Sequence, residues 1–149
     1  EWPGLNEYDG DALVRAVHAG PLASATTPEG YRQHFRLLRE GLTQWMAGAT
    51  QPQGMPSWPG FVAGVSAALD QVRAQFDGKV LLVSSGGPIA TAVAHVLGAP
   101  PAAVVELNLR IRNSALTEFA FTPKRHMLVS FNTVPHLDHP DRAGWVTYA

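Results

Sequence analysis

Cysteine is absent from the 149 residues, so the chain can form neither a disulfide framework nor a thiolate metal site. Long apolar runs are also missing, because no stretch approaches the roughly 20 residues that a membrane-spanning helix needs. No signal peptide is visible. We therefore expect a cytoplasmic protein that does not contact a membrane.

An excess of charge of either sign is absent as well. Eleven basic and twelve acidic residues leave a net charge of −1, which gives no bulk attraction for nucleic acid. The hydrophobic fraction of 46% and the charged fraction of 15% are typical of a folded soluble chain. A chain of this length is long enough to bury one core, and we expect one domain rather than two.

Hydrophobic spacing predicts several helices and three strands. Residues 10–17, 28–45 and 61–76 carry apolar side chains at intervals of three and four, and Thr27-Pro28 is a typical helix start. Val80-Leu81-Leu82-Val83 is a continuous apolar run, which predicts a strand buried on both faces of a parallel sheet. A helix from Pro88 to Leu97 and a hairpin over 115–131 follow it.

The turn at Ser84–Pro88 joins the predicted strand to the next helix. Orphan backbone N–H groups and the positive end of a helix dipole meet there, and glycine lets an anion approach closely. A tight strand-to-helix connection that needs glycine for its backbone explains the turn equally well. Neither a P-loop, nor a dinucleotide fingerprint, nor a nucleophile elbow fits the residues. Ser85 as a nucleophile is disfavoured, because no histidine has a spacing that makes it the base.

Three motifs in order resemble those of the histidine phosphatase (phosphoglycerate mutase-like) superfamily. Residues 5–9, Leu-Asn-Glu-Tyr-Asp, are similar to the segment that presents the catalytic acid. Residues 83–89 are similar to the valine-serine-histidine-glycine-glycine turn, and residues 112–117 to the stretch that leads into a late strand. The resemblance covers essentially the whole chain.

The resemblance implies an α/β fold with three layers, α/β/α, around a mostly parallel sheet. It implies phosphoryl transfer through a phosphohistidine, with an acid that protonates the leaving oxygen and no cofactor or metal. The catalytic positions it implies are Glu7 and Ser85, and the substrate or phosphate contacts are Ser84, Gly86, Gly87 and Asn113.

The chain departs from the family pattern at three points. The arginine-histidine-glycine segment with the nucleophile does not occur, so we expect residues 1–149 to be the C-terminal two-thirds of one such domain, with the N-terminal strands missing and no activity alone. Ser85 replaces the second pocket histidine, which removes a charged hydrogen-bond donor. Gly64 stands where many relatives carry an arginine.

Several residues have simpler interpretations. Asp9 precedes a predicted helix and is expected to be its N-cap, and an isolated Glu7 would be a solvated carboxylate. His136-Leu137-Asp138-His139 contains metal-ligating types, but a proline-flanked tail without further ligands is more typical of a surface loop. Arg110 and Arg112 fit a strand with one solvent face, or else steer phosphate.

Two classes of function remain open. One is a phosphomonoester hydrolase or a phosphoglycerate mutase-like enzyme acting on a small phosphorylated metabolite. The other is a noncatalytic phosphate-ligand-binding or interaction pseudoenzyme of the same fold. An incomplete sheet would leave apolar faces uncovered, so we expect association with the missing N-terminal segment or a homodimer.

Overall fold

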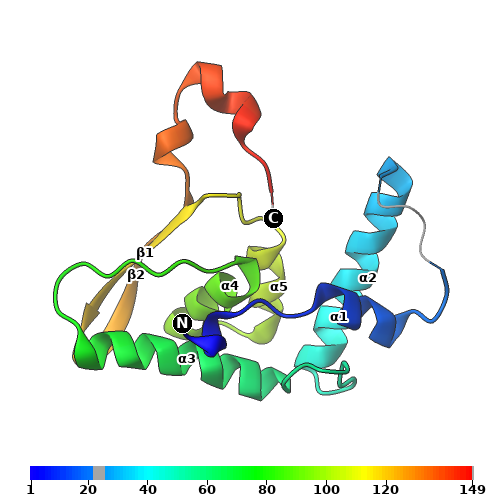
Figure 1. Cartoon of the computed structure of the whole chain (residues 1–149), viewed down its shortest axis with the longest axis horizontal. Coiled ribbons are helices and arrows are strands. Elements are labelled where there is room, and N and C mark those ends of the chain that lie inside the picture. The colour runs from blue at the N-terminus through cyan, green and yellow to red at the C-terminus, as the bar shows by residue number, and fades with distance from the viewer. Residues whose placement is uncertain (22–25, 149) are drawn as a thin grey trace. The chain divides into compact units, whose positions relative to one another are not determined.

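The computed structural model describes residues 1–21 and 26–148, and it is mostly helical with one antiparallel hairpin (Figure 1). Its elements are η1 (Pro3–Leu5), α1 (Gly10–Val17), α2 (Pro28–Met46), α3 (Trp58–Gln75), α4 (Gly86–Leu97), α5 (Pro101–Asn108), β1 (Leu116–Thr122), β2 (Arg125–Thr133), η2 (Pro135–Leu137) and η3 (Pro140–Trp145). They form two compact units, one of Tyr8–Phe61 and one of Glu1–Glu7 with Val62–Ala149. None of the helices within the described residues is long and apolar enough to cross a membrane.

In the unit Tyr8–Phe61, α1 packs against α2 at a close backbone approach. The Asp9 carboxylate accepts a hydrogen bond from the Ala12 N–H at 2.9 Å, which confirms it as the N-cap of α1. A Cβ on Gly41 would lie 2.7 Å from the Leu13 carbonyl oxygen, so this position of α2 needs glycine. Leu13 and Leu42 are buried beside it.

An aromatic cluster completes the core of this unit. Trp45 of α2 lies 5.2 Å from Trp58 and 5.4 Å from Phe61 between ring centroids, both in edge-on geometry. Tyr8 joins it at 6.1 Å from Trp45. The Trp45 indole N–H donates to the Pro56 carbonyl oxygen at 3.0 Å, which ties the proline-rich loop to α2.

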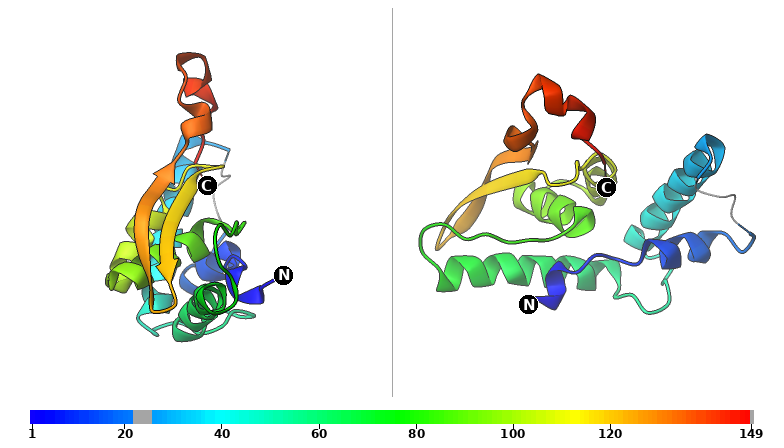
Figure 2. Two further views of the ribbon diagram at one scale, coloured as in Figure 1. Left: turned by 90° about the vertical axis from the view of Figure 1, so that its left-hand side faces the viewer. Right: turned by 45° about the horizontal axis from the view of Figure 1, so that its top comes forward.

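In the other unit, α4 packs against α5 and against β2 (Figure 2). The buried side chains include Val65 and Leu69 of α3, Val93 of α4, and Val104 and Val105 of α5. β1 and β2 pair antiparallel, with Phe119 opposite Leu128. The predicted hairpin is confirmed. Gly98 ends α4 in the left-handed conformation, which glycine adopts without strain.

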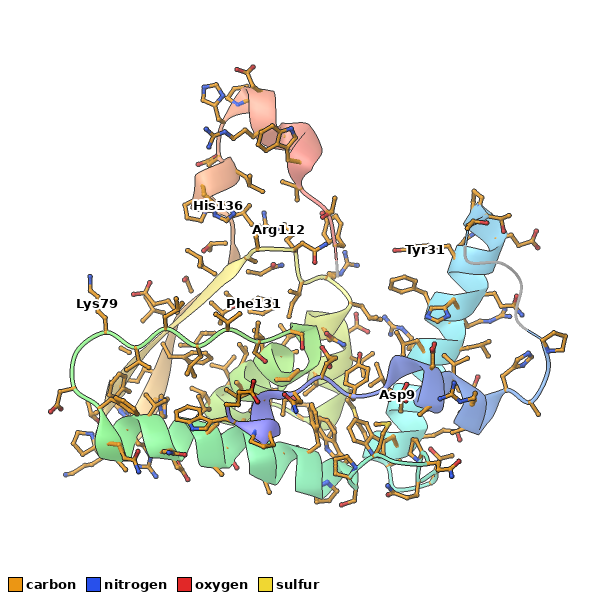
Figure 3. The ribbon with its side chains drawn as sticks, viewed as in Figure 1. Asp9, Tyr31, Lys79, Arg112, Phe131 and His136 are labelled. Atoms are coloured by element: carbon orange, nitrogen blue, oxygen red, sulfur yellow. The ribbon has the colours of Figure 1, made fainter. Side chains whose placement is uncertain are left out.

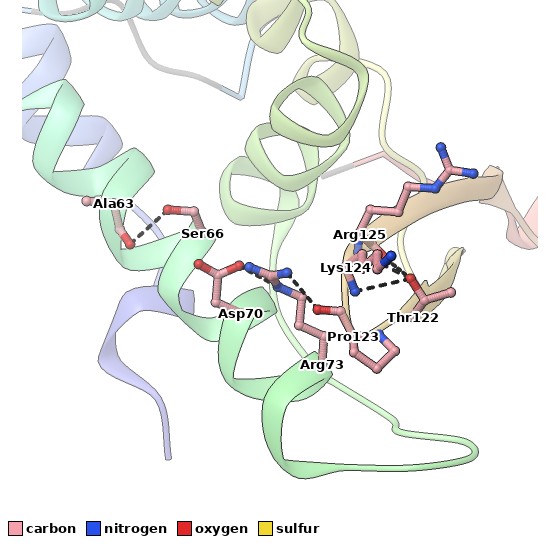
Figure 4. Close-up of polar contacts among 8 residues, drawn as sticks. All are labelled: Ala63, Ser66, Asp70, Arg73, Thr122, Pro123, Lys124 and Arg125. Carbon is pink, nitrogen blue, oxygen red and sulfur yellow. Dashed lines mark hydrogen bonds and ion pairs between the residues drawn. The ribbon is translucent and has the colours of Figure 1, made fainter.

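The hairpin turn is attached to α3 by one arginine (Figure 4). The Arg73 guanidinium donates to the Pro123 carbonyl oxygen at 3.0 Å and contacts Asp70 at 2.9 Å. Within the turn, the Thr122 hydroxyl oxygen accepts from the backbone N–H groups of Lys124 and Arg125, both at 3.3 Å. This contact fixes the hairpin relative to α3.

His126 lies at the start of β2 and stacks near Phe121, with ring centroids 5.8 Å apart. Its Nε2 is buried and has no hydrogen-bond partner among the described residues. Burial lowers the pKa of His126 below its ordinary value of 6.5, and the Arg73 guanidinium lowers it further, with a smaller contribution from His95 and an opposing one from Asp70.

The predicted buried strand at Val80–Val83 is wrong. These residues are extended but pair with no strand among the described residues, and Leu81 and Val83 are 82% and 86% exposed. A strand forms only where a neighbouring backbone supplies hydrogen bonds, and none of the residues that the structure describes supplies them to this run. The α/β character is therefore present as helices plus a hairpin, and the only sheet of the described residues is antiparallel.

The segment before the hairpin also differs from expectation. Arg110 and Arg112 belong to a turn, not to a strand, and Arg112 makes only an isolated bridge with Tyr148. The reason is that Asn132 bonds both, its side-chain amide donating to the Arg110 carbonyl oxygen at 2.7 Å and its Oδ1 accepting from the Arg112 N–H at 2.8 Å. These bonds close the turn against β2.

Candidate functional site

The start of α4 presents backbone N–H groups at a glycine-rich turn. Ser85 is the N-cap residue, yet its side chain makes no cap hydrogen bond, and Ser85 is exposed. Gly86, Gly87 and Pro88 form the buried first turn, and Pro88 has no N–H to satisfy. Two glycine N–H groups at the positive end of the helix dipole are thus left for acceptors from elsewhere.

Glu7 supplies one of those acceptors. Its Oε2 accepts a hydrogen bond from the Gly87 N–H at 2.8 Å, across a separation of 80 residues. The Ser84 hydroxyl donates to the Leu5 carbonyl oxygen at 2.7 Å, so the segment that carries Glu7 is bonded to the turn twice. Three of the sequence-predicted site residues, Glu7, Ser84 and Gly87, therefore lie together.

The segment before Glu7 is held on α3 by two glycines. A Cβ on Gly4 would lie 2.3 Å from the Gly64 carbonyl oxygen, and a Cβ on Gly64 would lie 3.0 Å from the Gly4 Cα. Any larger side chain at either position would push the segment away. Gly64, which the resemblance singles out as a lost arginine, thus has a packing reason of its own.

Two further residues shape the turn and were missed by sequence reasoning. Asn108, at the end of α5, is only 9% exposed, and its Oδ1 would lie 2.5 Å from a Cβ on Gly86. The buried Thr91 hydroxyl donates to the Gly87 carbonyl oxygen at 2.8 Å. Thr91 was accessible to prediction, since threonine in a helix often bonds the carbonyl four residues back. Asn108 was not, because its contact depends on how α5 packs on α4.

Asn113 is not joined to this arrangement by the contacts of its side chain. The Asn113 side-chain N–H groups donate to the Thr147 hydroxyl at 2.9 Å and to the Tyr148 carbonyl oxygen at 3.1 Å, so they bind the C-terminal tail. Ser85 belongs to the turn as the N-cap residue of α4, and it is exposed. Within residues 1–21 and 26–148, no group of three or more histidine, cysteine or acidic residues could hold a metal ion.

Glu7 and the glycine-rich start of α4 together form a site whose backbone N–H groups can bind an anion, with one carboxylate beside them. A comparison with protein families places it further: the model of the histidine phosphatase superfamily (branch 1) matches residues 6–134, and the chain belongs to that superfamily. The superfamily contains phosphatases and mutases. Neither a curated protein nor a solved structure matches the chain.

Proposed function

We propose that the protein is a phosphomonoester hydrolase or a phosphoglycerate mutase-like enzyme in which Glu7 is the acid. The observation that supports this proposal is the 2.8 Å hydrogen bond between the Glu7 carboxylate and the Gly87 N–H. It brings a carboxyl group beside backbone donors at a helix start, which is where a phosphoryl group is stabilised. The substrate would be a small phosphorylated metabolite.

In this mechanism the phosphoryl oxygens bond to the N–H groups of Gly86 and Gly87, with the Ser84 and Ser85 hydroxyl groups as further contacts. Substrate displaces the Glu7 side chain from Gly87, and Glu7 enters the reaction as the protonated carboxyl group. A histidine nitrogen attacks phosphorus, the bond to the leaving oxygen breaks, and Glu7 donates its proton to that oxygen. Water then attacks the phosphohistidine and gives a proton to Glu7, which releases phosphate and restores both groups.

The nucleophilic histidine is not assigned to this chain. The family's arginine-histidine-glycine triplet does not occur between Glu1 and Ala149, so the proposal needs polypeptide outside these residues. That polypeptide would complete a three-layer α/β/α domain of which residues 1–149 are the C-terminal two-thirds. The apolar run Val80–Val83 supports this part of the proposal, because Leu81, Leu82 and Val83 are exposed here and a segment of this composition would suit the middle of a parallel sheet once a neighbouring backbone paired with it.

A second candidate is a noncatalytic phosphate-ligand-binding or interaction pseudoenzyme. It is favoured by Ser85, a neutral hydroxyl where the resemblance implies a second pocket histidine. It is also favoured by the charge at the turn, since the group that contacts Gly87 is a carboxylate and not a cation. In this reading the run Val80–Val83 would be covered by a second copy in a homodimer.

The deciding experiment is turnover of para-nitrophenyl phosphate, measured from mildly acidic to neutral pH with the protein and any sequence that precedes Glu1. Wild type is compared with Glu7→Gln and Ser85→His. Glu40→Gln is the matched control, because Glu40 is an exposed glutamate of α2 whose carboxylate accepts a hydrogen bond from the Gln44 amide. We expect Glu7→Gln to lower kcat about 10²-fold or more and Ser85→His to raise it.

Other outcomes separate the two functions. No turnover in any variant, together with saturable phosphate binding by calorimetry, would favour the pseudoenzyme. Turnover that is the same in Glu7→Gln and in Glu40→Gln would remove Glu7 from the mechanism.

A further inference from the structure

A second cluster of chemistry-bearing residues lies at the end of the hairpin away from the Thr122 turn. Figure 3 shows Arg112 and His136 at this end. Within the described residues, Ser114 at φ 60° and Asn132 at φ 59° are the non-glycine residues with positive φ, and both belong to this cluster. Strained backbone of this kind persists only where its surroundings hold it, and it gathers at functional sites.

The strained conformation of Ser114 is held from both sides. The Asn113 N–H donates to the Thr147 carbonyl oxygen at 2.9 Å, and the Ala115 N–H donates to the Arg112 carbonyl oxygen at 3.2 Å. Asn132 fixes the same turn through its bond to the Arg112 N–H. The Ser114 hydroxyl is therefore presented by a rigid turn, in contrast to a side chain on a free loop.

His136 faces that hydroxyl. Its Nε2 lies 3.0 Å from the Ser114 Oγ. The ring belongs to η2, which begins at Pro135, and the His136 carbonyl oxygen accepts from the Arg142 guanidinium at 2.7 Å. Both residues of the pair are exposed, so reagents can reach them. A serine hydroxyl within hydrogen-bond reach of an imidazole is the arrangement that activates serine as a nucleophile.

We propose that Ser114 and His136 form a nucleophile–base pair that hydrolyses small activated carboxylic esters, at a site separate from the α4 turn. In the first step His136 Nε2 takes the hydroxyl proton, Ser114 Oγ bonds to the ester carbonyl carbon, and the alcohol leaves with that proton. In the second step water gives a proton to His136 and attacks the acyl-serine. The carboxylic acid leaves and Ser114 Oγ regains its proton.

Two arginines make the surroundings suitable for this chemistry. Arg112 lies two residues before Ser114, and its guanidinium bonds the Asn132 carbonyl oxygen. Arg142 bonds the backbone of His136. Positive charge near the pair stabilises the oxyanion that forms on the attacked carbonyl. The phosphoryl chemistry proposed above uses none of these residues, so either proposal can fail without the other.

The test is labelling by a fluorophosphonate, which forms a bond from Ser114 Oγ to phosphorus as fluoride leaves. The labelled residue is mapped by mass spectrometry, and hydrolysis of para-nitrophenyl acetate is measured in parallel. The informative variant is Ser114→Gly, because glycine adopts positive φ without strain and removes the hydroxyl together with its Cβ. His136→Gln tests the base. Ser66→Ala and His139→Gln are matched controls, since Ser66 is a half-buried serine of α3 and His139 is an exposed histidine of the same tail as His136.

We expect the label on Ser114, its loss in Ser114→Gly, and a labelling and hydrolysis rate about 10²-fold lower in His136→Gln. Ser66→Ala and His139→Gln should react as wild type does. Absence of label on Ser114 would overturn the proposal. So would ester hydrolysis that persists in Ser114→Gly and disappears in His136→Gln, because His136 would then be the nucleophile itself.

Discussion

Gly86 and Asn108 offer the sharpest test of how the α4 turn is built. A Cβ on Gly86 would lie 2.5 Å from the Asn108 Oδ1, whereas ordinary contacts begin at 3.4 Å, so Gly86→Ala demands a shift of about 0.9 Å. Asn108 is 9% exposed and cannot swing into solvent freely. Overpacking of this kind costs about 1–3 kcal/mol. The backbone at Gly86 does not have positive φ, so alanine is otherwise acceptable there.

The sign of the effect should depend on Asn108. Alanine stabilises a helix by about 1 kcal/mol relative to glycine, which offsets part of the steric cost. We expect Gly86→Ala alone to lower the free energy of unfolding by about 0–2 kcal/mol. Asn108→Ala alone should lower it by about 1–3 kcal/mol, because a buried polar side chain loses its interactions. On the Asn108→Ala background, Gly86→Ala should be neutral or stabilising.

The assay is thermal and urea unfolding followed by circular dichroism, at one protein concentration for all four species, because association contributes to apparent stability. For a chain of this size, about 1 kcal/mol corresponds to a melting shift of about 2–4 °C. The double-mutant cycle should give a coupling free energy of at least about 1 kcal/mol. A Gly86→Ala effect of the same size with Asn108 and with alanine would refute the reasoning.

Three further predictions concern other parts of the chain. Gly41→Ala should lower the free energy of unfolding by about 1–3 kcal/mol in urea titrations, because its Cβ would meet the Leu13 carbonyl oxygen at 2.7 Å, and a larger loss is expected from valine than from alanine. His126 has a lowered pKa in the folded protein, so the unfolded chain binds more protons, and the free energy of unfolding should fall as pH drops below the ordinary value of 6.5. The free energy of unfolding of His126→Gln should depend less on pH, and the same pH dependence in wild type and variant would contradict this. Leu81→Lys should leave the circular dichroism spectrum unchanged, because Leu81 is 82% exposed, but it should weaken self-association measured by sedimentation. Unchanged self-association would exclude residues 80–83 as the contact between two copies.

Much of the local structure was predictable from short-range rules. Asp9 and Thr27 are N-caps because each side chain accepts a hydrogen bond from the backbone N–H three residues later in the sequence. Such a contact depends on sequence neighbours alone. Gly78 and Gly98 adopt positive φ after helices for the same local reason. Val80–Val83 was mispredicted because an apolar run indicates only that its side chains favour burial. A strand also needs a neighbouring backbone, which the described residues of this chain do not provide.

The candidate site also contains residues that the sequence could predict and residues that it could not. The motif order in the sequence predicted that Glu7 and the turn at Ser84–Gly87 belong together, and the hydrogen bond between Glu7 and Gly87 joins them. Their catalytic roles stay predictions. Asn108 could not be found, because nothing in its sequence neighbours indicates a contact with Gly86. Ser114 and His136 are 22 residues apart, and only the hairpin brings them into contact.

The close approach of Gly4 and Gly64 leaves no room for a side chain at either position. An arginine at position 64 would collide with the segment that carries Glu7 unless that segment moved, because Gly4 Cα lies only 3.0 Å from the position of its Cβ. A side chain at position 4 would meet the Gly64 backbone in the same way. Because each added Cβ would meet backbone atoms, a substitution at one position cannot make room for a substitution at the other. Neither position can therefore acquire a charged side chain without moving the segment that carries Glu7.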